Sequence, residues 1–269
     1  MSTLEVPGAI LHYETQGDGP VLVLVPGANG EATAFKPLAD ALQVAFTVVR
    51  YDRRGFVDSR LTAAQEEGDR RLAADGDDVA RLLTHLGAAG SGFVFGNSSG
   101  AVVGMKFLLD HPNIAVKVIA HEPPVVKILP DADRWRDFFF RDYDEFKKCG
   151  MSAGIKMFAE HIVGPVDAEM ISLGNDPNPA RMNNAQYWVE HELRQYPNYD
   201  WDLDAIGAQK SKLVLAVGEG SRADDLWTSR PSLKIAERYG LPILEVPGYH
   251  LGFLQDPAEF AARIRSTLL

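Results

Sequence analysis

The chain is poor in three features that would assign it to a specialised class of protein. It has one cysteine, Cys149, among 269 residues, which excludes an intrachain disulfide framework. Its longest clean apolar run near the start, residues 21–25, is too short to cross a bilayer, and the first ten residues do not resemble a signal peptide. Lysine and arginine are outnumbered by aspartate and glutamate, 27 to 37, and nucleic acid and anionic membranes would repel the resulting net charge of −10. We therefore expect a cytoplasmic protein that binds neither nucleic acid nor membranes.

Sequence motifs for metals and cofactors are also missing. The chain contains no CxxC, HExxH or P-loop motif, and the pair Gly27 and Gly30 does not belong to a dinucleotide-binding fingerprint. We expect no cofactor and no metal.

Short apolar runs alternate with helical patterns along most of the chain. The runs are continuously apolar, as is typical of strands that are covered on both faces. They comprise residues 11–15, 21–25, 46–51, 93–95, 116–120, 213–217 and 243–246. The helical patterns comprise residues 35–42, 78–86, 101–109, 233–239 and 257–268. This alternation predicts an α/β fold with a mostly parallel central sheet and helices on both faces.

One long segment, residues 123–207, breaks this alternation. It begins with two prolines and contains helical patterns and many aromatic residues, but no convincing strand. We predict a core made of residues 1–122 and 208–269, with residues 123–207 inserted as a helical cap. Such a cap would cover the carboxyl edge of the sheet, where open α/β sheets bind ligands. Its aromatic residues fit an uncharged hydrophobic substrate, although we expect most of them to pack the cap onto the core.

The glycine pattern around Ser98 predicts a nucleophilic serine. A serine hydroxyl is a weak nucleophile and must be presented to a base on a sharp turn between a strand and a helix. Side chains two residues before and after the serine would clash in that turn, which favours Gly96 and Gly100 and excludes Ser99 as the nucleophile. The expected strand at 93–95 and helix at 101–109 provide the required context. The alternative is a glycine-rich turn without chemistry.

Among the seven histidines, His250 is the candidate general base. It is the last one in the chain and follows the last expected strand, which is where such a base belongs. His121, beside the sheet edge, is the one rival.

A histidine base also needs an acid that holds its tautomer and stabilises the imidazolium ion. The usual loop after residues 213–217 has Ser221 where an aspartate is expected, with Asp224 and Asp225 a little further along. Glu122 directly follows the strand at 116–120 and is long enough to reach the same histidine. We favour Glu122, and Asp224 and Asp225 remain alternatives.

An oxyanion that develops on the substrate requires backbone N–H donors. Ser99 supplies one at the start of the expected helix, and the loop after residues 21–25 supplies the second, since Gly27 and Gly30 let it turn inward. Gly27 is also a candidate for contact with the substrate.

Two further segments with acidic residues are given structural roles. Asp52 and Arg53 are candidates for structural ion pairs, and Asp77-Asp78 resembles a carboxylate pair at the start of a helix.

Four segments together resemble the zearalenone lactonase branch of the α/β-hydrolase superfamily. They are residues 25–31, 96–100, 121–124 and 247–250, with the sequences VPGANGE, GNSSG, HEPP and PGYH. The resemblance implies a catalytic triad of Ser98, Glu122 and His250. It also implies an oxyanion hole made by the N–H groups of Ala28 and Ser99, and a cap tryptophan, Trp188, in contact with the substrate.

These features together predict a serine hydrolase that cleaves a carboxylic ester or lactone of a hydrophobic small molecule through an acyl-enzyme. A carbon–carbon bond hydrolase or a cofactor-free perhydrolase would use the same triad. From another class, a small-molecule receptor with weak hydrolytic activity would share the fold. The expected partner is the ester or lactone substrate, and a homodimer is left open.

Overall fold

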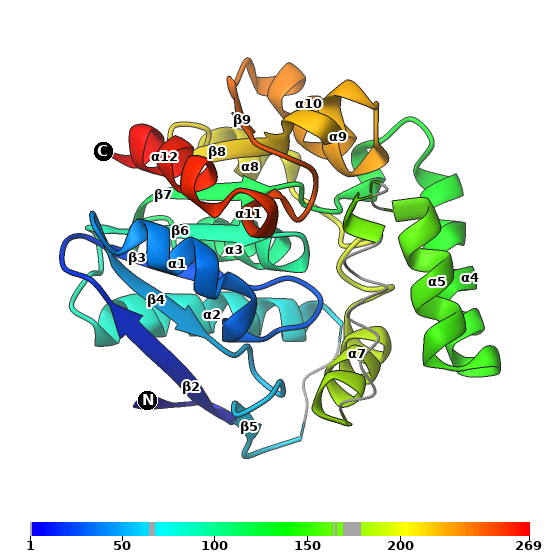
Figure 1. The fold of residues 1–269 in the computed structure, drawn as a ribbon, viewed down its shortest axis with the longest axis horizontal. Helices are drawn as coiled ribbons and strands as arrows, with labels where there is room; N and C mark the ends of the chain where they lie inside the picture. Colours follow the sequence, from blue (N-terminus) through cyan, green and yellow to red (C-terminus); the bar gives the residue numbers. More distant parts are fainter. Residues whose placement is uncertain (1, 65–67, 163, 165, 169–178) are drawn as a thin grey trace.

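The computed structural model describes all residues except 1, 65–67, 163, 165 and 169–178, and a single β-sheet forms its centre (Figure 1). Within the described residues the strand order is β1-β2-β4-β3-β6-β7-β8-β9, with the short β5 beside β2. The strands are β1 (Ser2–Val6), β2 (Ala9–Gln16), β3 (Val21–Val25), β4 (Thr47–Tyr51), β5 (Arg60–Leu61), β6 (Gly92–Asn97), β7 (Ala115–His121), β8 (Leu213–Gly218) and β9 (Ile243–Val246). From β4 through β9 in this order all neighbours are parallel, whereas β1, β2 and β5 pair antiparallel. The structure therefore confirms the predicted mostly parallel sheet.

Helices cover the sheet on both faces, which explains why its strands are continuously apolar. In β3, Val23 and Val25 belong to the same buried cluster as apolar residues of α2 and α3, whereas Leu22 and Leu24 join a second cluster with α1 and α12. The helices of the core are α1 (Lys36–Leu42), α2 (Asp69–His85), α3 (Ser99–Asp110), α9 (Glu219–Ala223), α10 (Arg230–Tyr239), α11 (Gly252–Gln255) and α12 (Pro257–Leu268). Because successive side chains of a strand point to opposite faces, each central strand must be apolar at nearly every position.

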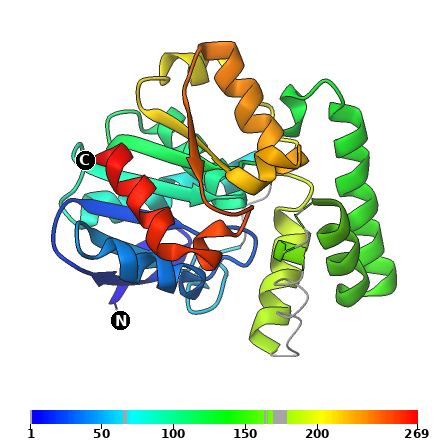
Figure 2. The same cartoon turned by 45° about the horizontal axis from the view of Figure 1, so that its top comes forward.

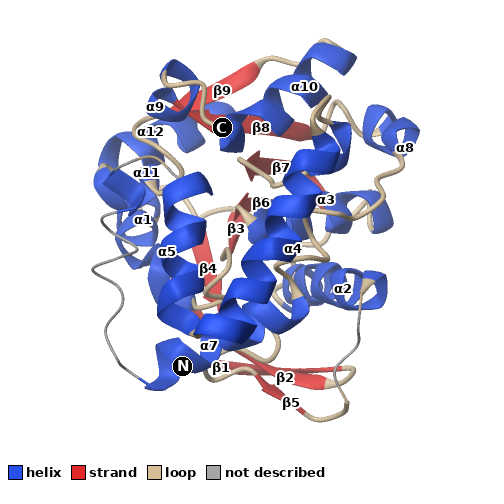
Figure 3. Cartoon of the chain, turned by 90° about the vertical axis from the view of Figure 1, so that its right-hand side faces the viewer, coloured by secondary structure: helices blue, strands red, loops and turns tan. Residues whose placement is uncertain are grey.

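The segment 123–207, which we call the insertion, lies between β7 and β8. It contains α4 (Ala132–Cys149), α5 (Met151–Ile162), α7 (Pro179–His191) and most of α8 (Leu203–Ala208). Helices α4, α5 and α7 lie beyond one edge of the sheet (Figures 1 and 2), and from that side they stand in front of the central strands (Figure 3). Its last part joins the buried cluster on the α2–α3 face through Tyr196, Trp201 and Ile206. The insertion therefore extends from the open edge of the sheet back into its core.

One prediction about the core is wrong. Helix α2 begins at Asp69, so Asp77 and Asp78 lie within it rather than at its start. The reason is that Asp78 is buried and accepts two hydrogen bonds from the Arg54 guanidinium, at 2.8 and 2.6 Å. Burial raises the pKa of Asp78 to about 6, although the charge and hydrogen bonds of Arg54 oppose this shift. The prediction failed because it considered only the residues next to Asp78, whereas the partner of Asp78, Arg54, lies 24 residues away in the sequence.

Candidate active site

Ser98 occupies a strained turn between β6 and α3. Its backbone has φ 56° and ψ −124°, outside the regions that residues with a side chain favour. A Cβ atom at Gly96 would lie 2.2 Å from the carbonyl oxygen of Gly100, and one at Gly100 would lie 2.0 Å from that of Val25. Both positions therefore require glycine, and the half-buried Ser98 stands at the apex of the turn.

Glu122 and His250 form a hydrogen-bonded pair at the end of β7. The His250 Nδ1–H donates to Glu122 Oε2 at 2.8 Å, and the second carboxylate oxygen accepts from the Gly218 N–H at 3.0 Å. Burial by itself would raise the pKa of Glu122, but the hydrogen bond and charge of His250 lower it to about 2, with help from Gly218. An ionised Glu122 fixes the proton on Nδ1, which leaves Nε2 of His250 available to accept a proton.

The other candidate acids lie elsewhere. Asp224 is exposed and accepts from the Tyr249 hydroxyl at 2.9 Å, and Asp225 is exposed and pairs with Arg230 at 2.9 Å. The carboxylate that accepts a hydrogen bond from the His250 ring is that of Glu122.

Asn97 and His121 support His250 from behind. The Asn97 amide donates to the His250 carbonyl oxygen and to His121 Nδ1, both at 3.1 Å. The His121 ring is stacked with Phe95 on one hand and with His250 on the other, with centroid distances of 6.2 and 6.1 Å. Complete burial lowers the pKa of His121 to about 4, so at neutral pH this ring is an uncharged acceptor. His121, the rival base, is thus engaged in holding the His250 loop.

The predicted oxyanion donors are the backbone N–H groups of Ser99 and Ala28. Ser99 is the first residue of α3, so its N–H has no acceptor within the helix. Gly27 packs against the turn so closely that a Cβ atom there would lie 3.2 Å from Ser98 Cβ. Among the residues that the structure describes, no acceptor takes the N–H of Ala28, the next residue. Both N–H groups are therefore without a hydrogen-bond acceptor among the described residues.

A cavity that opens to solvent is lined by Ser98, Ser99, Glu122 and His250, and it contains about 360 Å³ of atom-free space. Its remaining walls are mostly apolar and come largely from the insertion. They include Phe139 of α4, Phe158 of α5, Trp188 of α7, Leu193, Pro197 and the core residue Trp227. Trp188, the predicted substrate contact, is thus part of the wall.

Comparison with known proteins assigns the family. A model of the alpha/beta hydrolase family matches residues 22–263. The chain belongs to this family. It is 32% identical over 269 residues to "Uncharacterized hydrolase YraK" of Bacillus subtilis (strain 168), with 99% of this chain and 95% of the relative covered.

Solved structures of other alpha/beta hydrolases share the fold. A thermophilic esterase from Thermogutta terrifontis superposes with a TM-score of 0.76 at 19% identity, covering 100% of this chain and 98% of the other. The enol-lactonase from Burkholderia xenovorans LB400 superposes with a TM-score of 0.69 at 17% identity, covering 99% of each chain. Within the described part of the chain, none of the helices combines the length and apolar character needed to cross a membrane.

A buried ionic network connects the core of this alpha/beta hydrolase with its insertion. Arg53 follows β4, and Arg71 and Asp75 lie in α2, whereas Glu192 and Tyr196 belong to the insertion. Glu192 accepts from Arg53 at 2.8 Å through each of its oxygens and from Arg71 at 2.7 Å. Asp75 lies 3.4 Å from Arg53 and accepts from the Tyr196 hydroxyl. The predicted ion-pairing role of Arg53 thus has partners from both parts of the chain.

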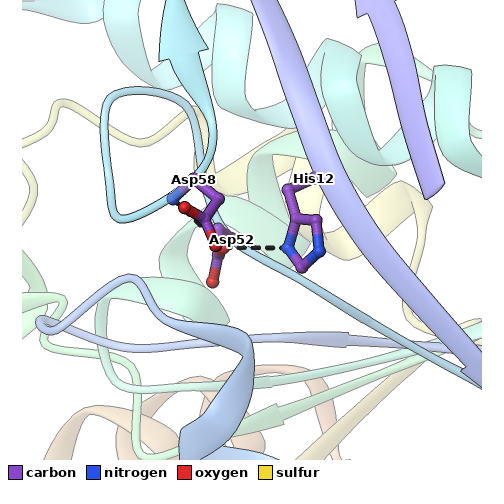
Figure 4. Close-up of side chains that lie close together, drawn as sticks. All are labelled: His12, Asp52 and Asp58. Carbon is purple, nitrogen blue, oxygen red and sulfur yellow. Dashed lines mark hydrogen bonds and ion pairs between the residues drawn. The ribbon is translucent and has the colours of Figure 1, made fainter. Parts of the chain in front are cut away.

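A second group of titratable side chains surrounds His12 of β2 (Figure 4). In the described residues, His12, Asp52 and Asp58 each offer a ligand atom within 4.8 Å of the others. The Asp52 carboxylate, however, already accepts from His12 Nδ1 at 3.1 Å and from the Ala32 N–H at 2.7 Å. These bonds brace the loop after β4, in keeping with the structural role predicted for Asp52.

Three residues beside the site have no role in the sequence-based predictions. Asn97 lies inside the glycine motif, where its position alone signals no function. Glu192 and the buried Asp167 belong to the insertion, and Asp167 accepts from the Leu251 N–H at 3.3 Å and from Gln255 at 2.7 Å. No local pattern sets these two apart, because Glu192 lies two residues after Glu190 and Asp167 lies two residues before Glu169 in the sequence.

Proposed function

We propose that the protein is a serine hydrolase that cleaves carboxylic esters or lactones of hydrophobic small molecules through an acyl-enzyme. The observation that carries the proposal is that Ser98, Glu122 and His250 line one cavity, with the Glu122 carboxylate 2.8 Å from His250 Nδ1. A strained serine, an imidazole and a buried carboxylate are the components of this chemistry.

In the first step, Ser98 Oγ bonds to the substrate carbonyl carbon while His250 Nε2 takes the hydroxyl proton. His250 then gives this proton to the leaving alcohol oxygen as the carbon–oxygen bond breaks. In the second step, His250 takes a proton from a water molecule that attacks the acyl-enzyme, and returns it to Ser98 as the acid leaves. With a lactone the alcohol stays tethered, so the product is a single hydroxy acid.

The N–H groups of Ala28 and Ser99 are the proposed oxyanion hole. Ser99 directly follows Ser98 at the start of α3, and Ala28 follows Gly27, which packs against Ser98 from the loop after β3. Donors of this kind contribute about 3–4 kcal/mol each to the transition state of comparable reactions.

We also propose that residues 123–207 act as a cap domain over a core of residues 1–122 and 208–269, and that Trp188 and Gly27 contact the substrate. The apolar walls supplied by Phe139, Phe158 and Trp188 support an uncharged, hydrophobic substrate. The zearalenone lactonase resemblance and the enol-lactonase structure, together with the esterase structure, make macrocyclic lactones and simple aryl esters the substrates to test first.

The test compares hydrolysis of p-nitrophenyl butyrate and zearalenone by wild type, Ser98→Ala and Asp225→Asn. We expect Ser98→Ala to abolish turnover of whichever substrate the wild type cleaves, and the exposed Asp225→Asn to leave it unchanged. Turnover that survives in Ser98→Ala would refute the proposal. Tight binding of these compounds without turnover by wild type would favour a receptor instead.

A further inference from the structure

We infer that Arg53 is a positioning residue for the oxyanion hole, and that Glu192 of the insertion holds Arg53 in place. The inference rests on the proposed function, because it concerns the Ala28 N–H that the proposal assigns to the oxyanion.

The peptide unit between Gly27 and Ala28 is held at its carbonyl end. Arg53 Nη2 donates to the Gly27 carbonyl oxygen at 2.8 Å, and the Gly30 N–H donates to the same oxygen at 3.0 Å. No peptide bond in the described chain is cis, so in this planar unit the Ala28 N–H points opposite to the Gly27 carbonyl. Fixing the carbonyl oxygen therefore fixes the direction of the N–H.

The other end of this peptide unit is free. Gly27 lies against Ser98, and no acceptor among the described residues takes the Ala28 N–H. An N–H group without a partner has no bond of its own to keep it aimed. Its direction therefore depends on the two groups that donate to the Gly27 carbonyl oxygen. Of these, Arg53 is charged and makes the shorter hydrogen bond.

Arg53 is suited to this role because its own position leaves it little freedom. The side chain is fully buried, and Glu192 accepts from both of its terminal nitrogens at 2.8 Å. Burial by itself would lower the pKa of Arg53, but the charges of Glu192 and Asp75 raise it, so the guanidinium stays charged. A planar guanidinium held by a carboxylate at two nitrogens has its three remaining N–H groups fixed in direction, including the Nη2 N–H that donates to Gly27.

Through Glu192 and Arg53, the insertion thus influences the direction of the Ala28 N–H without touching the substrate. Glu192 belongs to the insertion and lines the cavity, yet its oxygens are engaged by Arg53 and Arg71. When the insertion is seated, Arg53 is clamped and the Ala28 N–H is aimed.

The chain contains a matched control in Arg71. It is as buried as Arg53 and pairs with the same Glu192 and Asp75, but its recorded partners do not include Gly27. Arg53→Lys and Arg71→Lys each replace one fork of the same network by a point charge. Only Arg53→Lys also replaces the side chain that donates to the Gly27 carbonyl oxygen.

The experiment measures kcat and KM of both variants with the ester or lactone that wild type cleaves. It also measures inhibition by an aryl trifluoromethyl ketone, which adds to the serine and places an oxyanion in the hole. We expect Arg53→Lys to lower kcat by about 10- to 100-fold, less than the loss of a whole donor, with KM changed less than about threefold. Inhibition should weaken by a similar factor, and Arg71→Lys should change kcat less than about threefold.

Equal losses of kcat in the two variants, or a rise of KM alone in Arg53→Lys, would overturn the inference. If Arg53→Lys does not fold, Glu192→Gln is compared with Asp78→Asn, which weakens the buried Arg54 pair nearby. A lower kcat at unchanged KM in Glu192→Gln alone supports the inference, and equal values overturn it. Ser98→Ala separates the two levels: if it stays active, the proposed function fails, whereas if it is inactive and the arginine variants are equal, this inference fails alone.

Discussion

Two buried glutamates line the same cavity, one from each part of the chain, and they differ in what they hold. Glu122 of the core accepts one hydrogen bond from His250 and one from a backbone N–H. Glu192 of the insertion accepts three hydrogen bonds from two guanidinium groups. An imidazole can gain and lose a proton near neutral pH, whereas a guanidinium stays protonated. Glu122 therefore orients a group that exchanges a proton, whereas Glu192 holds two groups whose charge does not change.

The largest expected effect separates the two glutamates by rate. Glu122→Gln should lower kcat by about 10³- to 10⁴-fold, because an amide neither holds the His250 tautomer nor stabilises the imidazolium ion. Glu192→Gln should lower kcat by about tenfold or less, since it acts only through Arg53. Steady-state kinetics of both variants, with circular dichroism to verify folding, would measure the difference. A larger loss in Glu192→Gln would reverse the comparison.

The second effect separates them by stability. Glu192→Gln removes one of the two carboxylates that balance Arg53 and Arg71, and uncompensated buried charge typically costs about 3–5 kcal/mol. Glu122→Gln should cost less, about 1–2 kcal/mol, because its partner is an imidazole and not a permanently charged guanidinium, so no buried charge is left uncompensated. Urea unfolding of the two variants at pH 7.5 measures both losses. Equal losses in the free energy of unfolding would mean that the ion pairs of Arg53 stabilise the fold no more than ordinary hydrogen bonds do.

A third effect sharpens the description of the Glu122 side of the cavity. The pKa of His121 is lowered by burial to about 4, so the unfolded chain binds a proton there at a higher pH than the folded chain does. Folding stability from this residue is therefore present above about pH 6.5 and is lost as the pH falls toward 4, by about 3 kcal/mol in total. His121→Gln should lack this component, so its stability should approach that of wild type as the pH falls from 7 to 4. A gap that stays constant with pH would contradict the burial of a neutral ring.

The smallest effect concerns the acids that do not contact His250. Asp225→Asn breaks an exposed pair with Arg230, and such pairs contribute about 0–1 kcal/mol. Activity should be unchanged, and the free energy of unfolding should shift by about 0.5 kcal/mol or less. A large loss of kcat in this variant would return Asp225 to the list of candidate acids.

The fold and the centre of the site could be predicted because their signals are local. The continuous apolar run of β3 follows from its burial on both faces, and the two glycines around Ser98 follow from backbone clashes within five residues. Glu122 could be favoured because the end of a strand sets its position. Each of these inferences depends on neighbours in sequence or on one rule of sheet topology.

The connections between core and insertion could not be predicted for the opposite reason. Arg53 and Glu192 are 139 residues apart, and nothing near either one indicates its partner. The same is true of Asp78 within the core. Its neighbours in sequence are typical of a helix start, and they do not indicate its pairing with Arg54. Buried ion pairs are chosen by the three-dimensional packing, and a sequence pattern of period 2 or 3.6 carries no information about them.

The most direct test of the central claim is covalent labelling with a fluorophosphonate, followed by peptide mass spectrometry. This reagent phosphonylates a serine that a neighbouring base activates. We predict a single label on the peptide that contains Ser98 in wild type and in Asp225→Asn, much slower labelling in Glu122→Gln, and none on that peptide in Ser98→Ala. An unlabelled Ser98 in wild-type protein that still hydrolyses its ester, or a label on another serine, would contradict the account.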